Sequence, residues 1–125
     1  MNSRNKGKRG ELELSHVLQG YGYDVKRGHQ TNGALGEADC EGLPGIHIEC
    51  KRVENLNIYK AMHQSESDAI AESSRKGETL VPAVFHRKNN EEWLITMSLK
   101  DFMEKFYKEG GEADERRNVL VQEFR

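Results

Sequence analysis

Three ionisable residues in the middle of the chain stand at a spacing that could build a metal site. Glu49 and Lys51 are two positions apart in an alternating segment, so a β-strand there would put both on one face. Asp39 comes ten positions before Glu49, and a Gly-Leu-Pro-Gly turn between them allows a hairpin that sets the two carboxylates side by side. Carboxylates beside an ammonium group suit a hard cation and an anionic substrate. This spacing predicts a Mg²⁺ site that faces a phosphate.

Two further oxygen ligands are within reach of this predicted site. Glu11 lies on or beside the apolar stripe of the first predicted helix, where it could add a carboxylate directly or through water. The backbone carbonyl of Cys50 could add another ligand, because Mg²⁺ binds few protein groups and keeps several waters. The alternative is that Glu49 and Lys51 form a surface ion pair on a solvated strand face, worth about 0–1 kcal/mol. His47 shares the face of Glu49 and is expected to be a neighbour of the metal rather than its ligand.

The elements that must position these residues follow from hydrophobic periodicity. An amphipathic helix is expected over 8–19, with Leu14, Val17, Leu18 and Tyr21 on its apolar stripe, after a flexible basic arm over 1–6. A second helix over 58–75 should end at Gly77. Strands are expected over 23–27, 37–41, 46–51, 80–85 and 92–97, with a loop over 28–36. The order of helix, three strands, helix, two strands, helix predicts an α/β fold with a mixed sheet flanked by helices.

The third predicted helix begins after Ser98, which stands three residues before Asp101 at a capping offset. Leu99, Phe102 and Met103 lie on the apolar stripe of this helix, together with Phe106.

The chain is long enough for one domain, and its basic residues are unevenly distributed. The chain has 125 residues and a formal net charge of -2, with no apolar run long enough for a membrane span and only two cysteines. A reducing cytoplasm is therefore expected, which would be the host cytoplasm if the protein is phage-encoded. Twelve of the 19 basic residues form doublets. Phosphate responds to local rather than net charge, so contacts with a nucleic-acid backbone are expected from basic residues near the site: Lys6, Lys8, Arg9 and Arg52.

Taken together, these motifs resemble the PD-(D/E)XK nuclease superfamily, and within it the archaeal-type Holliday junction resolvases and their phage relatives. Gly36-Glu37-Ala38-Asp39 resembles the first half of the motif, with Ala38 in place of proline, and Ile48-Glu49-Cys50-Lys51 resembles the second half. Lys6-Gly7 and Glu11-Leu12-Glu13-Leu14 match the start of the first helix, and the apolar segment 81–85 matches a strand of the resolvases. The resemblance covers about residues 6–100 and implies a restriction-endonuclease-like αβββαββα core.

The resemblance also implies Mg²⁺-dependent hydrolysis of DNA phosphodiesters, with Mn²⁺ expected to substitute. Glu11, Asp39 and Glu49 would hold the metal, and Lys51 would orient or deprotonate the attacking water or stabilise the transition state. Gln64 resembles a helix glutamine that assists the active site in several nucleases of this fold. His29 would contact phosphate from the 28–36 loop, as loops at this position do in resolvases.

A four-way junction needs two coordinated nicks, which a two-fold dimer would supply. The apolar helix 99–106, the Trp93 strand and the tail are the candidate interfaces. The expected organisation is a nuclease domain over 1–110 and a charged tail over 111–125. Three alternatives stay open: another nuclease on the same scaffold (flap, single-strand or restriction type), a DNA-binding module that does not cleave, and a protein–protein adaptor.

Overall fold

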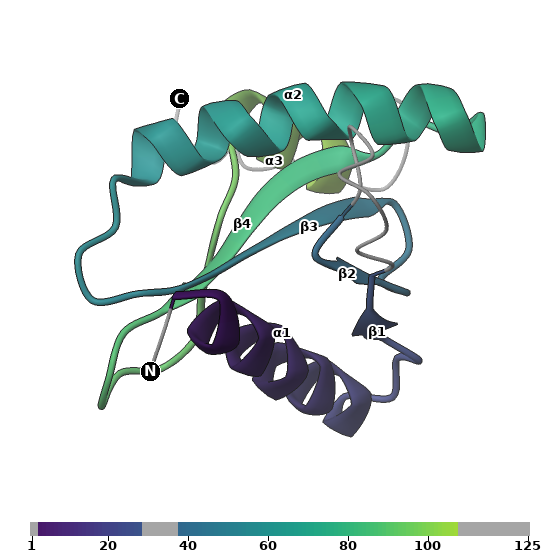
Figure 1. Ribbon diagram of the computed structural model, residues 1–125. Helices are drawn as coiled ribbons and strands as arrows, with labels where there is room; N and C mark the ends of the chain where they lie inside the picture. Colours follow the sequence, from purple (N-terminus) through teal and green to yellow (C-terminus); the bar gives the residue numbers. More distant parts are fainter. Residues whose placement is uncertain (1–2, 29–37, 108–125) are drawn as a thin grey trace, which may run out of the picture.

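The computed structural model describes residues 3–28 and 38–107, with side chains described from residue 7 onward. Eight elements follow one another in the predicted order (Figure 1): α1 (Ser3–Gly20), β1 (Lys26–Arg27), β2 (Cys40–Glu41), β3 (Ile46–Arg52), α2 (Ile58–Lys76), β4 (Val81–Arg87), β5 (Leu94–Thr96) and α3 (Leu99–Phe106). The predicted α/β fold and its order of elements are confirmed. In this part of the chain no helix is both long and apolar enough to cross a membrane.

The five strands form one mixed sheet in the order β1-β2-β3-β4-β5. β3 and β4 are the long central strands and run parallel, with Glu49 beside Val84, and α2 makes the crossover that a parallel pair requires. The other three pairings are antiparallel. The tight turn between β2 and β3 uses Gly42 and Gly45, which both have positive φ. The predicted hairpin that carries Asp39 toward Glu49 is therefore present.

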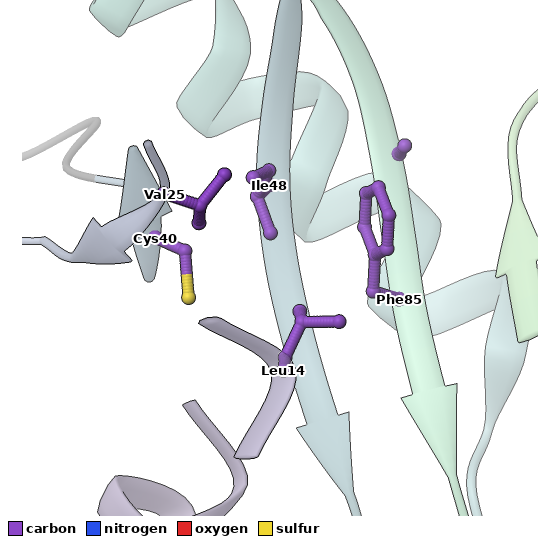
Figure 2. Packing of buried hydrophobic residues seen from close by; sticks show 6 residues of the cluster. Leu14, Val25, Cys40, Ile48 and Phe85 are labelled. Carbon is purple, nitrogen blue, oxygen red and sulfur yellow. The ribbon is translucent and has the colours of Figure 1, made fainter. Parts of the chain in front are cut away.

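Helices cover both faces of the sheet, with α1 on one side and α2 on the other (Figure 1). Against α1 lies the main apolar cluster, in which Leu14 packs with Val25, Cys40, Ile48 and Phe85 (Figure 2). Against α2 lies a smaller cluster built by Ala61, Met62 and Val84. The inward residues predicted for α2, including Ser65 and Ala69, are indeed buried. Because successive side chains of β3 point to opposite faces of the sheet, Ile48 lies on the α1 side and Glu49 on the α2 side.

Several boundaries and faces differ from the sequence prediction. The helix begins at Ser3, so residues 3–6 continue α1 instead of forming a flexible arm. Val17 and Tyr21 were expected on the buried stripe but are exposed, Tyr21 by 77%. The reason is that β1 and β2 are only two residues long, so the sheet does not extend under the end of α1. Within the predicted loop only Gly28 is described; the remainder, and the charged tail over 111–125, lie outside the described residues.

The third helix is capped as predicted, since the Ser98 hydroxyl accepts a hydrogen bond from the Asp101 amide. Its apolar stripe does not pack into the core: Leu99 is 75% exposed, and the other stripe residues are exposed as well. Among the described residues, none of this helix is buried.

Candidate active site

Asp39 is held in place by the backbone of the neighbouring strand. Its amide donates to the carbonyl of Ile48 at 3.0 Å, and its carbonyl accepts from the amide of Gly28 at 2.8 Å. Its side-chain Oδ2 accepts a 2.8 Å hydrogen bond from the backbone amide of Cys50. The carboxylate is thus fixed beside the strand that carries Glu49, as the hairpin prediction required.

Asp39 forms one electrostatic unit with three other predicted site residues. Burial raises the pKa of Asp39 to about 7, with a further upward contribution from Glu49. The amide of Cys50 opposes this shift, Glu11 adds to it, and Lys51 opposes it. Carboxylates that are crowded together and partly removed from water repel one another, and a divalent cation would offset this repulsion. The donor set is all carboxylate oxygen, which suits Mg²⁺. The residues fit the predicted ion.

Glu11 reaches the site from α1, where its side chain is largely buried and close to the Nε of Arg27 on β1. Sequence reasoning placed Glu11 near the site but gave Arg27 no role. The structure pairs the two, so Arg27 holds the Glu11 carboxylate from the edge of the sheet. The backbone carbonyl of Cys50 stays a predicted ligand: the amide of the same residue binds Asp39.

Lys51 lies between two side chains that sequence reasoning assigned to the site. Its Nζ is 3.9 Å from Oε2 of Glu49 and donates a 3.3 Å hydrogen bond to Oε1 of Gln64 on α2. Gln64 is therefore next to Lys51, and its side chain is exposed on α2. Glu49 is only 3% exposed, so the alternative of a solvated strand face is wrong for this residue.

The polar face of β3 meets a polar stripe of α2 that runs in the opposite direction. Two residues of a strand advance about 6.6 Å and four residues of a helix about 6 Å, so the two periods stay in step. Three pairs result: Lys51 with Gln64, Glu49 with Asp68, and His47 with Glu72. The i, i+4, i+8 spacing on α2 was a signal for this stripe, but polar residues on an amphipathic helix are ordinarily assigned to solvent.

His47 is completely buried in this interface. Its Nδ1 is 2.8 Å from Oε1 of Glu72, and its Nε2 is 3.5 Å from Oε1 of Glu49. Burial acts to lower the pKa of His47, but the contacts with Glu49 and Glu72 outweigh burial and raise it to about 9. Lys76 lies 3.2 Å from the other oxygen of Glu72 and completes the row of charges toward the surface. Sequence reasoning placed His47 near Glu49 but missed Glu72 and Asp68.

The predicted DNA-binding residues are only partly described. Lys8 and Arg9 are exposed on α1, just before Glu11. Arg52 is half-buried and already engaged: its guanidinium lies 3.6 Å from Glu13 and donates to Asn89 at 3.0 Å. The side chain of Lys6, and the whole of His29, lie outside the described residues.

Comparison with known proteins gives a likeness in fold. No protein-family model matches the chain, and no curated protein matches it in sequence. Its structure is similar to that of Hjc from Archaeoglobus fulgidus, a Holliday junction resolvase from an archaeal hyperthermophile, with a TM-score of 0.52. The match covers 74% of this chain and 72% of the archaeal chain at 18% sequence identity. The chain therefore shares its fold with this archaeal protein, and at this identity the likeness shows the fold alone.

Proposed function

We propose that the chain is a divalent-metal-dependent DNA endonuclease of the PD-(D/E)XK superfamily, most like a Holliday junction resolvase. One observation carries the proposal: the Asp39 carboxylate is pinned to the Cys50 amide and buried beside Glu49 and Glu11, with Lys51 next to them. Carboxylates in this arrangement, next to a lysine at the end of a hairpin, suit metal-assisted attack on a phosphodiester. The likeness in fold to a Holliday junction resolvase supports the choice of substrate class.

Asp39, Glu49 and Glu11, with the carbonyl of Cys50, would hold Mg²⁺ or Mn²⁺. When bound, the ion neutralises phosphate charge and lowers the pKa of an attacking water. Lys51 is assigned to the charge that develops on the phosphate in the transition state, because its ammonium group is paired with Glu49 and still partly open to solvent. Gln64 is assigned as a positioning residue, since it accepts a hydrogen bond from Lys51.

DNA would approach over the N-terminal half of α1. Lys8 and Arg9 are exposed there, one turn or less before Glu11, and with Lys6 would bind the duplex backbone. His29 would add a contact from the loop between β1 and β2. Arg52 already contacts Glu13 and Asn89, and a DNA phosphate would have to compete with them. We therefore expect Arg52 to contribute least to DNA binding.

We further propose a homodimer that acts on branched DNA in the cytoplasm, with 1–110 as the nuclease domain and 111–125 as a charged tail. Two sites related by a two-fold axis match the two nicks that a four-way junction requires. Of the surfaces predicted to mediate pairing, the exposed apolar face of α3 is the best suited. Trp93 is less available, because it packs against the core and its Nε1 donates to Glu13 at 3.1 Å.

The test compares cleavage of a labelled four-way junction, a flap and a linear duplex, with and without Mg²⁺. The Asp39→Asn variant keeps an acceptor for the Cys50 amide but loses the charge, and it should bind the junction without cutting it. Asp24→Asn is the matched control, since Asp24 is an exposed carboxylate that pairs with Lys26 at the surface. Equal cutting of duplex and junction would remove the resolvase assignment and leave another nuclease on the same scaffold. Junction binding without any metal-dependent cutting would leave a DNA-binding module, and the absence of salt-sensitive DNA binding would leave an adaptor.

A further inference from the structure

A second group of possible metal ligands lies beside the first, on the α2 side of the sheet. One ligand atom each from His47, Glu49 and Asp68 lies within 4.8 Å of the other two. His47 and Glu49 come from alternate positions on one face of β3, and Asp68 comes from the facing stripe of α2. Asp39 and Glu11 do not belong to this group. Glu49 is the one residue that both sites share.

Two atoms in this group are buried and lack a hydrogen-bond partner among the described residues: Nε2 of His47 and Oε1 of Glu49. The two atoms face each other at 3.5 Å. Two ligands of a tetrahedral ion at metal–ligand distances near 2.1 Å stand about 3.4 Å apart, so this separation already fits a shared ion. Buried polar atoms normally form hydrogen bonds, and these two lie within ion-pair distance of each other without forming one, which makes their facing arrangement informative.

Glu72 fixes the orientation of His47. Its Oε1 lies 2.8 Å from Nδ1 of the imidazole, so Nε2 is turned toward Glu49 and Asp68. A histidine that binds a metal usually gives its other ring nitrogen to a carboxylate in this way. Lys76 neutralises the second oxygen of Glu72 at 3.2 Å. Glu72 thus binds one ring nitrogen of His47 and leaves the other, Nε2, free of hydrogen bonds to the described residues, as in a histidine that binds a metal.

We infer that His47, Glu49 and Asp68 bind a divalent first-row transition-metal ion, with Glu72 as the residue that positions His47. A donor set of one imidazole nitrogen and two carboxylates favours Mn²⁺, Co²⁺ or Zn²⁺ over Mg²⁺, which prefers oxygen alone. Asp68 is only half-buried, so the ion can enter from the side of α2. The inference extends the proposed function at the shared Glu49, but its test measures binding and stands without nuclease activity.

The test uses Co²⁺ and the full chain in the Asp39→Asn background, where the first site is disabled. Visible absorption bands of Co²⁺ report coordination number, and calorimetry gives stoichiometry and affinity. We expect one Co²⁺ per chain with bands of a four- or five-coordinate ion. Adding Asp68→Asn should weaken binding at least 10-fold, and Glu72→Gln should weaken it by about 10- to 100-fold, because the carboxylate that orients His47 is lost.

Glu66→Gln is the matched control, because Glu66 lies on the same helix outside the cluster and should leave Co²⁺ binding unchanged. Circular dichroism of each variant shows that the fold is retained, and Asp68 is chosen over the buried His47 for that reason. Binding that Asp68→Asn leaves unchanged would overturn the inference and would favour a protonated His47 that bridges Glu49 and Glu72. If the Asp39→Asn chain binds no Co²⁺ while the parent chain still cleaves DNA, the inference fails and the proposed function stands.

Discussion

His47 and Glu72 are joined by a 2.8 Å contact between Nδ1 and Oε1, and neither side chain reaches solvent. The pair links the start of β3 to the C-terminal half of α2. Because Glu49 lies on the other side of the imidazole, the contact that fastens the helix to the sheet also positions a predicted site residue. The same buried contacts of His47 therefore hold α2 on the sheet and fix the position of Glu49.

Removing Glu72 should cost far more than removing an ordinary surface acid. Glu72→Ala would leave Nδ1 of His47 facing a cavity without its partner, and breaking a buried pair in this way costs about 3–5 kcal/mol. Glu72→Gln keeps an acceptor for the imidazole and should cost less. Urea unfolding followed by circular dichroism measures both, with Glu66→Ala on the same helix as the comparison. Equal destabilisation by Glu72→Ala and Glu66→Ala would show that the buried pair does not support the fold.

Lys51 should matter to cleavage and little to binding. Lys51→Ala removes the ammonium group assigned to the transition state, so we expect a loss of about 10²–10³-fold in single-turnover cleavage with junction affinity kept. Gln64→Ala should cause a smaller loss, since Gln64 only holds Lys51 in place. Lys60→Ala removes an exposed lysine from the first turn of α2 and serves as the control. A loss of junction affinity equal to the loss of rate would mean that Lys51 acts in binding instead.

The parts of the fold that the sequence predicts are those set by local periodicity. The face of α2 with Ala61, Met62 and Ser65 repeats at a helical period, and the turn before β3 is marked by glycines, so both follow from spacing. The burial of Glu72 does not, because it depends on His47, twenty-five residues earlier in the chain. A polar residue at a helical period is buried only when another element offers it a partner, and no local pattern reveals that partner.

Gly10 is required where α1 crosses the end of β3. A Cβ added there would lie 2.5 Å from the Cβ of Arg52, so the helix and the strand would have to move apart. Gly10→Ala should therefore destabilise the protein by about 1–3 kcal/mol and should shift Glu11, one residue further on. Gly7 is the control within the same helix, since a Cβ there has no neighbour within 4 Å, and Gly7→Ala should stabilise by about 0.5–1 kcal/mol. Opposite signs in thermal unfolding are the expected result, and destabilisation by both substitutions would contradict the argument from close approach.

His86 should make the protein sensitive to acid. It lies on β4, where Nε2 is 2.8 Å from the hydroxyl of Thr96, and burial lowers the pKa of its imidazole below 6.5. The unfolded chain then takes up a proton at a higher pH than the folded chain does, so stability falls as pH decreases below about 6.5 and is unaffected by this group above it. His86→Gln still reaches Thr96 but does not titrate, so its free energy of unfolding should fall less than that of the parent between pH 7.5 and 5.5. His16→Gln, on the exposed face of α1, controls for loss of a histidine, and parallel pH profiles for the parent and His86→Gln would count against the burial argument.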